Sequence, residues 1–258
     1  MKVIITAPRG KMDQLIVKVA AESQDMEIVA GLGVKGRPYI GKDVGIVAGL
    51  GYEVGAPVIG DFHAVTLHSQ GQSAIEFCDL IIDFSTVDLS MEVLEQAVKY
   101  NKPLICGTTG FREEQVAHIK ESGKHIPILF AANTSYMVNV MRSLVEKASQ
   151  HLGSITDVEI LDMHDVKKVD APSGTAKELG EAIEKVSGIK VRETAYHSIR
   201  SGDIPSSHTV IFGGLGERLE ITHHAYNWEC YARGACQAAK FLMGKEAGLY
   251  SMEDVIMV

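Results

Sequence analysis

The sequence predicts an α/β fold in which a doubly wound parallel sheet is joined to an α+β domain with an open mixed sheet. The first half alternates short apolar strand-like runs with helical patterns, the arrangement that gives a parallel sheet. The second half has longer strand-like runs with a single clear helix among them. The chain has 258 residues, of which 46% are hydrophobic and 22% charged. This length is enough for one large or two medium domains with a real core.

In the first half, apolar runs predict strands, and apolar residues recurring every three or four positions predict helices. Ser85 and Asp88 are expected to form a capping box for a helix that ends at Tyr100. Gly31–Gly60 holds nine glycines, which predicts a long irregular segment. The predicted strands are Val3–Thr6, Glu27–Leu32, Leu80–Phe84, Pro103–Cys106 and Ile126–Ala131. The other predicted helices are Lys11–Ala21 and Glu113–Ser122.

In the second half, an amphipathic helix over Met137–His151 precedes the strand-rich part. Thr175–Val186 is the one clear helix among the strands, and a last helix over Tyr231–Met243 is expected to return to the first domain. The expected domains are 1–131 plus 238–258, and 132–237. The predicted strands are Ile155–Met163, Thr194–Arg200, His208–Phe212 and Arg218–Ala225.

Charge and composition exclude several classes of protein. Lysine and arginine number 25 against 33 acidic residues, a formal net charge of −8, which is unlike a nucleic-acid-binding protein. No apolar run reaches the roughly 20 residues that span a bilayer, and Met1–Gly10 lacks the features of a signal peptide. The four cysteines have neither CxxC nor zinc-finger spacing. We therefore expect a cytoplasmic protein with reduced thiols, no metal site, and no membrane or nucleic-acid partner.

Polar residues follow four of the predicted parallel strands. Ligands of doubly wound sheets bind beyond the carboxyl ends of the strands, so these segments are expected to converge on one crevice. The segments are Ala7–Lys11, Ser85-Thr86, Gly107–Gly110 and Asn133–Ser135.

The run from Ile4 to Asp13 lies where a dinucleotide phosphate loop lies, after a strand and before a helix. In a G-x-x-G-x-x-G version, the three glycine positions would be Ala7, Gly10 and Asp13, so only Gly10 remains. An ordinary turn between a strand and a helix explains this run equally well.

The stretch from Asp162 to Ala176 reads D-M-H-D-V-K-K-V-D-A-P-S-G-T-A. It places His164 and Lys168 at the end of a strand and Ser173-Gly174-Thr175 at a helix start. Free N–H groups and hydroxyls at a helix N-terminus bind carboxylates, lysine adds positive charge, and histidine can donate a proton near neutral pH. The alternative is a helix cap beside a solvated loop, which would suffice to explain Ser173 alone.

The run H-D-V-K-K-V-D-A-P-S-G-T-A resembles the signature of the bacterial dihydrodipicolinate reductase family. The resemblance extends over nearly the whole chain, because further segments agree in order. These are Asp83-Phe84-Ser85, Gly107-Thr108-Thr109-Gly110-Phe111, Phe130-Ala131-Ala132-Asn133-Thr134-Ser135, and Gly216-Glu217-Arg218-Leu219-Glu220-Ile221-Thr222-His223.

The resemblance implies a cytoplasmic homotetramer that reduces 4-hydroxy-tetrahydrodipicolinate with NADPH or NADH, in lysine and diaminopimelate biosynthesis. It implies a Rossmann-type dinucleotide domain and a substrate domain that also forms the tetramer. By motif position, His164 would be the general acid/base, and Lys168 would grip the dicarboxylate substrate. The implied substrate-binding residues are Asp165, Ser173, Gly174 and Thr175. The implied cofactor-binding residues are Ala7, Arg9, Gly10, Lys11, Met12, Gly33, Val34, Lys35, Gly107, Thr108, Thr109, Ala131, Ala132, Asn133 and Thr134.

The chain departs from the family pattern in the cofactor half. Ala7 and Asp13 replace two glycines, so a methyl group could crowd a pyrophosphate and a carboxylate could repel it. Gly33-Val34-Lys35 stand where an acidic residue for the adenosine ribose is expected. A 2′-phosphate could instead be held by Arg9, Lys11, Lys35 and Arg37.

The substrate half departs as well. Asp165 stands where a second histidine is usual and should disfavour a dicarboxylate unless Lys167 or Lys168 neutralises it. Gln237 stands where some members have arginine. Three hypotheses follow: an active reductase with a loosened dinucleotide site, a related imine reductase with another substrate, or a non-catalytic assembly or regulatory subunit. Intact His164 and Lys168 favour catalysis, and the altered glycines favour the third hypothesis.

Overall fold

The computed structural model describes residues 1–66 and 71–257. The chain forms two compact units. Unit 1 consists of Met1–Ser135 and Glu229–Val258, and unit 2 of Tyr136–Trp228. Unit 2 is thus inserted between two stretches of unit 1.

Unit 1 is built on a seven-stranded sheet with the order β11-β6-β5-β4-β1-β2-β3. All pairings between its neighbouring strands are parallel. The strands are β1 Lys2–Thr6, β2 Glu27–Leu32, β3 Val58–Ile59, β4 Leu80–Asp83, β5 Leu104–Cys106, β6 Pro127–Phe130 and β11 Gly248–Tyr250.

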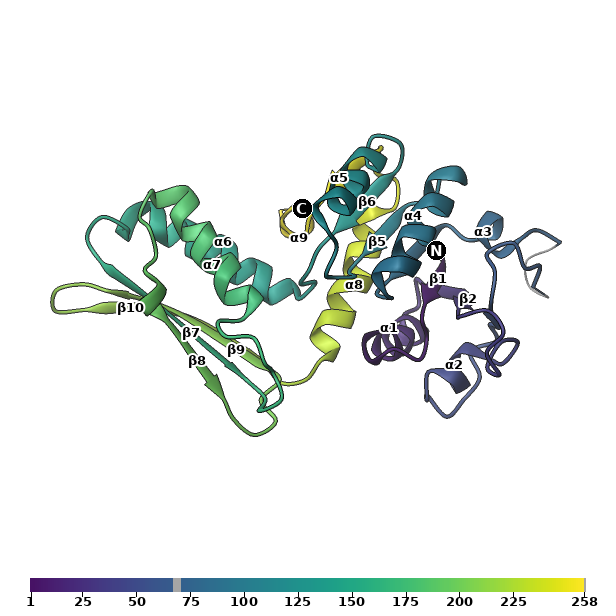
Figure 1. The fold of residues 1–258 in the computed structure, drawn as a ribbon, viewed down its shortest axis with the longest axis horizontal. Helices are drawn as coiled ribbons and strands as arrows, with labels where there is room; N and C mark the ends of the chain where they lie inside the picture. The colour runs from purple at the N-terminus through teal and green to yellow at the C-terminus, as the bar shows by residue number, and fades with distance from the viewer. Residues whose placement is uncertain (67–70, 258) are drawn as a thin grey trace. The chain divides into compact units, whose positions relative to one another are not determined.

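Helices cover both faces of this sheet (Figure 1). Successive strand residues point to opposite faces, so Val3 and Ile5 of β1 pack in one core while Ile4 packs in the other. The first face is covered by α1 Lys11–Glu22, α2 Val44–Val47, α8 Glu229–Leu242 and α9 Met252–Ile256. The second is covered by α3 Ala74–Phe77, α4 Val87–Lys99 and α5 Glu113–Ser122. The predicted doubly wound sheet is confirmed.

One local prediction in unit 1 was wrong, and another is confirmed only in part. Ser85 and Asp88 form no capping box: α4 begins after Thr86, whose side chain makes no capping hydrogen bond. The Ser85 hydroxyl instead donates to Asp83 at 2.6 Å, because the buried Asp83 carboxylate attracts hydroxyl donors. The glycine-rich segment Gly31–Gly60 is not wholly irregular, since it contains α2 and β3.

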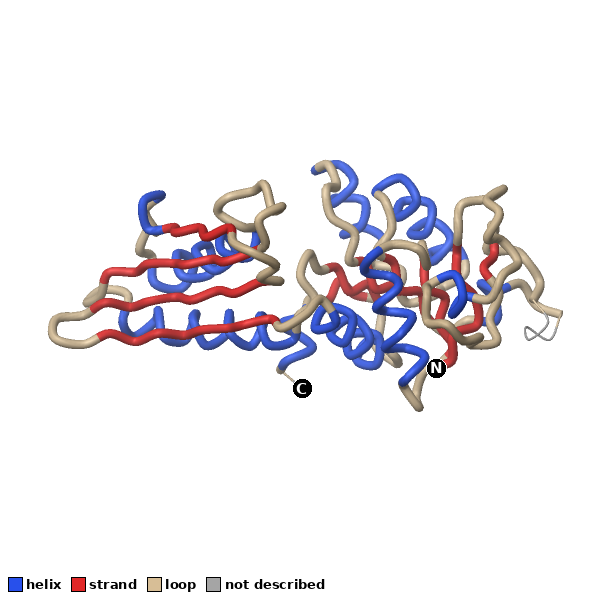
Figure 2. Tube along the Cα trace, turned by 90° about the horizontal axis from the view of Figure 1, so that it is seen from below, coloured by secondary structure: helices blue, strands red, loops and turns tan. Residues whose placement is uncertain are grey.

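Unit 2 has a four-stranded mixed sheet with the order β10-β9-β7-β8. The β7–β8 pair is parallel, and the other two pairs are antiparallel. Two helices pack on one face (Figure 2) and form a core with β7 and β9. The elements are α6 Tyr136–Leu152, β7 Asp157–His164, α7 Gly174–Ser187, a 3-10 turn Glu193–Ala195, β8 Tyr196–Arg200, β9 Ser206–Gly213 and β10 Arg218–Ala225. The predicted open mixed sheet is confirmed.

The strand register in unit 2 gathers polar residues at one end of the helix-covered face. Asp162 of β7 lies opposite His208 of β9 and Ser198 of β8, and His164 lies opposite Arg200. Farther along β7, the same face carries Val158 and Ile160 of the apolar core. The helix-covered face of β7 is therefore apolar in its first part and polar at its carboxyl end.

Every helix within the described residues is too short or too polar to cross a bilayer.

Candidate active site

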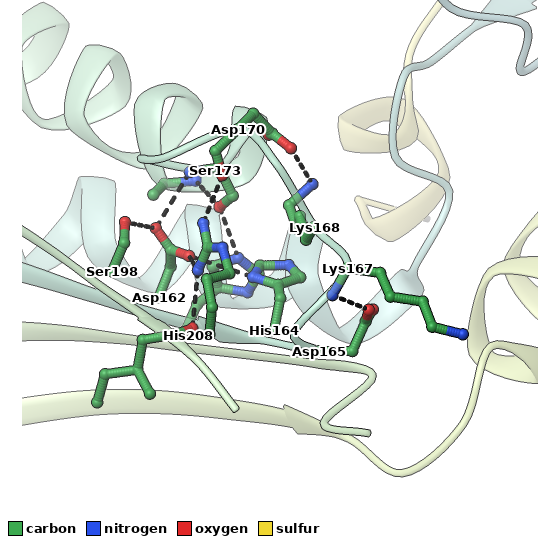
Figure 3. A network of polar contacts seen from close by, with 12 residues as sticks. Asp162, His164, Asp165, Lys167, Lys168, Asp170, Ser173, Ser198 and His208 are labelled. Carbon is green, nitrogen blue, oxygen red and sulfur yellow. Dashed lines mark hydrogen bonds and ion pairs between the residues drawn. The ribbon is translucent and has the colours of Figure 1, made fainter. Parts of the chain in front are cut away.

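The polar cluster in unit 2 lies at the carboxyl end of β7, beneath the start of α7 (Figure 3). Its residues come from β7, β8, β9 and the loop 165–173, so the site depends on the whole fold of unit 2. Among the described residues, no group of three His, Cys, Asp or Glu side chains is arranged to hold a metal ion.

Asp162 is the centre of this cluster. Its carboxylate accepts hydrogen bonds from the Ser173 N–H at 3.1 Å, the Ser198 hydroxyl at 2.7 Å and Arg200 Nη1 at 2.6 Å. Burial alone would raise the pKa of Asp162, but these donors and the Arg200 charge outweigh it and lower that pKa. Asp162 is therefore a fixed anion within the cluster.

His164 is oriented by Asp162. Its Nδ1 lies 3.2 Å from Asp162 Oδ1, which leaves Nε2 as the nitrogen that can exchange a proton with a ligand. Burial, followed by the positive charge of Lys168, lowers the pKa of His164, and the contact with Asp162 counteracts both. A histidine so balanced is suited to giving and taking a proton.

A second histidine, His208, packs against the first. Their ring centroids are 5.2 Å apart at an interplanar angle of 72°. His208 Nε2 lies 3.2 Å from the Ser173 hydroxyl, and Nδ1 is buried without a hydrogen-bond partner. Burial, followed by the neighbouring His164, lowers the pKa of His208 to about 3, so this ring is neutral and positions its neighbours.

The loop after β7 holds the lysines. Lys168 Nζ lies 2.9 Å from Asp170, and Arg200 Nη2 donates to the Asp170 carbonyl at 2.6 Å. Asp165 accepts a hydrogen bond from the Lys167 backbone N–H at 2.9 Å, so its carboxylate closes the turn. The Lys167 side chain points away from the histidines (Figure 3).

The start of α7 faces the same end of the sheet. Ser173 is the N-cap and accepts from the Ala176 N–H at 3.2 Å. The Ser173 N–H donates to Asp162, and its hydroxyl lies beside His208. Both polar groups of Ser173 therefore make contacts that hold the cluster together. A Cβ at Gly174 would meet nothing within 4 Å, so open space adjoins the first turn, where Thr175 follows. Helix N-terminal N–H groups favour anions, and Lys168 adds positive charge.

Unit 1 contains a cleft of about 880 Å³. It lies beyond the carboxyl ends of β1, β2 and β4, where a parallel sheet binds its ligand. Five predicted cofactor residues line it: Ala7, Gly10, Gly33, Val34 and Lys35.

In the turn between β1 and α1, Ala7 replaces a glycine but has a backbone conformation that glycine favours. Ala7 has φ of 41°, in the left-handed region that favours glycine. Its N–H donates to the Leu32 carbonyl at 2.7 Å, and its carbonyl accepts from the Gly10 N–H at 2.7 Å. These contacts hold the strained residue so that α1 begins at Lys11 with its N-terminus at the cleft.

Asp13 differs from the repulsive anion expected from sequence. It is buried, 1% exposed, and lines the cleft. Burial, followed by the nearby Asp83, raises its pKa to about 9, so the carboxyl group is neutral near pH 7. A Cβ at Gly10 would overlap Asp13 Oδ2, so a larger residue there would displace the Asp13 carboxyl group.

The other predicted cofactor residues are not among those that line the cleft. Thr108 donates to Asp83 at 3.2 Å, and Thr134 donates to the Tyr231 carbonyl at 2.8 Å, so both hydroxyls support the fold. Arg9 lies over the Tyr39 ring, 5.4 Å from its centroid, beside the turn that holds Lys35. The remaining residues outside the cleft lining are Lys11, Met12, Gly107, Thr109, Ala131, Ala132 and Asn133.

The prediction of site residues missed part of the cleft. Ser85 and Thr86 line it, as their place after a parallel strand had indicated, although they were not assigned to the cofactor. Four acidic residues of the lining come from a loop and from α4, and no local sequence pattern indicates them. They are Asp61, Asp88, Glu92 and Glu95. The missed lining residues are Asp13, Leu32, Gly60, Asp61, Phe62, His63, Phe84, Ser85, Thr86, Asp88, Leu89, Glu92, Glu95 and Gln96.

Both units of the chain are similar to known proteins. Family models described as dihydrodipicolinate reductase, N-terminus and C-terminus, match residues 1–134 and 137–256. The 4-hydroxy-tetrahydrodipicolinate reductase of Geotalea daltonii is 36% identical over 99% of this chain and 98% of its own. That of Burkholderia thailandensis is 35% identical over the same shares.

Solved structures show the same fold. The dipicolinate-bound dihydrodipicolinate reductase from Paenisporosarcina sp. TG-14 has a TM-score of 0.79 at 24% identity, covering 98% of each chain. An amine dehydrogenase from Mycobacterium smegmatis has a TM-score of 0.63 at 10% identity, covering 98% of this chain and 95% of its own. With both family models matched and relatives aligned over nearly the full length, the chain belongs to the dihydrodipicolinate reductase family.

Proposed function

We propose that the chain is an NAD(P)H-dependent oxidoreductase that reduces 4-hydroxy-tetrahydrodipicolinate to tetrahydrodipicolinate in lysine and diaminopimelate biosynthesis. Family membership over the whole chain supports this activity. The observation that carries it is the pairing of His164 with Asp162 beside Lys168 and the open first turn of α7.

The residues of unit 2 suit a dicarboxylate. Lys168 would bind a carboxylate oxygen through its positive charge. The N–H groups of Gly174 and Thr175 would bind carboxylate oxygens through the dipole at the helix N-terminus. His164 Nε2 would deliver a proton, while Asp162 holds the ring through Nδ1. The net reaction takes up a hydride and a proton and releases the 4-hydroxyl group as water.

The residues of unit 1 fit a reduced nicotinamide dinucleotide, which supplies the hydride when bound. The turn at Ala7–Gly10 and the N-terminus of α1 would receive the pyrophosphate. Lys35 would contact the adenosine side, with Arg9 beside it on Tyr39. In this assignment the dinucleotide domain comprises residues 1–131 with 238–258, and the substrate domain residues 132–237.

We further propose self-association into a homotetramer through the sheet face of unit 2 opposite α6 and α7. Strand alternation places Leu161, Met163 and Ile211 on that face, together with the exposed Ile199 of β8. Light scattering of the wild type against Ile199→Asp tests this, because an assembly held by this face should dissociate in the variant. No disulfide joins the four cysteines, all of which lie in the described part of the chain, and this agrees with a reducing, cytoplasmic location.

The decisive experiment measures NADH and NADPH binding by calorimetry, with and without pyridine-2,6-dicarboxylate, together with turnover of 4-hydroxy-tetrahydrodipicolinate. Binding of both ligands with turnover supports the proposal. Binding of the dinucleotide without turnover of this substrate would favour a related imine reductase. Loss of dinucleotide binding altogether would favour a non-catalytic member of the family.

A further inference from the structure

The carboxyl group of Asp13 occupies an unusual place at the dinucleotide cleft. Asp13 is the third residue of α1, a helix of 12 residues whose N-terminus adjoins the cleft. The side chain lines the cleft although it is 1% exposed, and its Oδ1 has no hydrogen-bond partner in the protein. A buried polar atom without a partner is costly, so an unpartnered carboxyl oxygen on a residue that lines a cleft points to a ligand that completes its hydrogen bonding.

Asp83, the neighbouring carboxylate, has the opposite surroundings. Four hydroxyl groups can donate to it, from Thr6 at 2.8 Å, Ser85 at 2.6 Å, Ser90 at 2.5 Å and Thr108 at 3.2 Å. Both oxygens of the Asp83 carboxyl group therefore have hydrogen-bond partners within the protein. Two adjacent buried carboxyl groups cannot both be charged without a large cost. Burial, followed by the Asp83 charge, raises the pKa of Asp13 to about 9, although a hydrogen bond from its own backbone N–H acts in the opposite direction.

The other charged groups around α1 do not offset the repulsion from Asp83. Asp83 is the charged group that acts most strongly on Asp13. On the side where α8 packs, the charges are paired: Lys18 and Arg233 with Glu229, and Lys240 with Asp25. Arg9 lies in the turn before α1, and Lys11 is the first residue of that helix. The ionisable groups that share the cleft lining are Lys35, Asp61, His63, Asp88, Glu92 and Glu95.

We propose that the carboxylic acid of Asp13 donates a hydrogen bond to a phosphate oxygen of the dinucleotide. This inference rests on the proposed function, since it assumes that the dinucleotide occupies this cleft. A protonated carboxyl group has one O–H donor, and a bond from it to a phosphate oxygen is charge-assisted. Asp13 therefore takes the part of a phosphate-binding donor where the family's loop has a glycine.

The consequence is a pH-dependent affinity. When Asp13 loses its proton, the donor disappears and a negative charge faces the phosphates. With the pKa of Asp13 near 9, the affinity should be nearly constant up to about pH 8 and fall about tenfold by pH 10, because only the protonated form binds.

The proton on Asp13 can be observed directly. The side-chain carboxyl ¹³C resonance of Asp13, assigned by comparison with Asp13→Asn, should titrate with a midpoint well above pH 7 in the free protein. A midpoint near pH 4 would overturn the proposal regardless of any binding result.

The binding test compares wild type, Asp13→Asn and Asp13→Gly by calorimetry with NADH and NADPH from pH 7 to pH 10. Asparagine donates through its amide at every pH, so Asp13→Asn should bind within about threefold of wild type at pH 7 and lack the alkaline fall. Asp13→Gly has no side-chain donor and should bind about tenfold more weakly than Asp13→Asn, also without the alkaline fall. Circular dichroism confirms that each variant is folded, and Asp13→Gly provides the comparison if Asp13→Asn is not.

The outcomes separate this inference from the proposed function. Absence of dinucleotide binding to all three proteins at every pH overturns the proposed function and this inference with it. Binding whose pH dependence is the same in wild type and Asp13→Asn overturns the inference alone. Tighter binding by Asp13→Gly than by wild type at pH 7 would also overturn it, since that result belongs to a repulsive carboxylate.

Discussion

Nδ1 of His164 lies 3.2 Å from Oδ1 of Asp162, two residues earlier on the same strand. Residues two apart on a strand point to the same face, so β7 presents the proton-transfer group and its orienting anion together. Asp162 is in turn fixed by donors from α7 and β8. The orientation of His164 is therefore set by three separate elements of unit 2.

Replacing His164 by Gln should lower kcat by about 10²–10⁴-fold, the usual contribution of general acid–base catalysis. Dicarboxylate binding should change little, because Lys168 and the start of α7 remain. In the wild type, burial and Lys168 lower the pKa of His164, so a step that needs its proton should slow as pH rises through a value below 6.5. Steady-state kinetics across pH 5–9 measure both effects, and undiminished turnover in His164→Gln would remove the histidine from the mechanism.

Replacing Lys168 by Ala should weaken pyridine-2,6-dicarboxylate binding and lower kcat/KM, each by at least about tenfold, because the charge beside His164 is lost. Lys167→Ala is the matched control, since that side chain points away from the histidines (Figure 3). Calorimetry on both variants gives the comparison. Equal losses in the two variants would show that net charge alone, and not the position of Lys168, governs binding.

Replacing Asp165 by Asn should strengthen dicarboxylate binding. The side-chain oxygen of asparagine can still accept from the Lys167 N–H and close the turn, but the negative charge is gone. The gain should shrink as salt is raised, because exposed charges are screened. Titrations at low and high ionic strength check this, and an unchanged affinity at both would mean that Asp165 lies outside the reach of the ligand.

Replacing Ala7 by Gly should stabilise unit 1. The left-handed backbone of Ala7 costs a residue with a Cβ about 1–2 kcal/mol, and the greater freedom of glycine in the unfolded chain offsets part of this gain. We expect a net increase of up to about 1 kcal/mol in the free energy of unfolding. Ala117→Gly, on the exposed face of α5, is the control and should destabilise by about 1 kcal/mol. Urea unfolding measures both, and a loss of stability in Ala7→Gly would show that Ala7 is not strained.

Unit 2 should lose stability in acid because of His208. Its pKa is about 3 in the folded protein and about 6.5 when unfolded, so the unfolded state binds more protons between these values. The free energy of unfolding contributed by this residue should therefore fall by up to about 1.4 kcal/mol per pH unit from pH 6.5 toward pH 3. The fluorescence of Trp228, the one tryptophan in the chain, reports on unit 2. His208→Gln should lack this slope, and an identical slope in both proteins would assign the acid sensitivity elsewhere.

The sequence was sufficient for most regular elements and for the motif around His164. Helices such as α1, α5 and α7 have apolar residues at helical spacing, and this pattern is local. Ser85 was assigned wrongly because its partner is Asp83, a strand residue whose need for donors follows from burial. β11 was missed because three residues make a strand only when β6 is beside them.

The contributions of His208 and Asp13 could not be predicted, because each depends on long-range packing. His208 reaches the site through the β7–β9 register, 46 residues from Asp162 along the chain. Asp13 appears from sequence to be a repulsive charge at a helix N-terminus. Its protonation follows from its burial beside Asp83, which is 70 residues away in the sequence.

The insertion of unit 2 into unit 1 determines the order in which the protein can fold during synthesis. α8 contributes Ala232, Ala235, Ala239 and Leu242 to the core beneath the parallel sheet, and β11 pairs with the edge strand β6. Both segments leave the ribosome after all of unit 2. The nascent N-terminal part therefore waits with an uncovered apolar face while unit 2, complete in itself, can already fold. The parallel sheet of unit 1 is therefore completed only by the last segments of the chain to be synthesised.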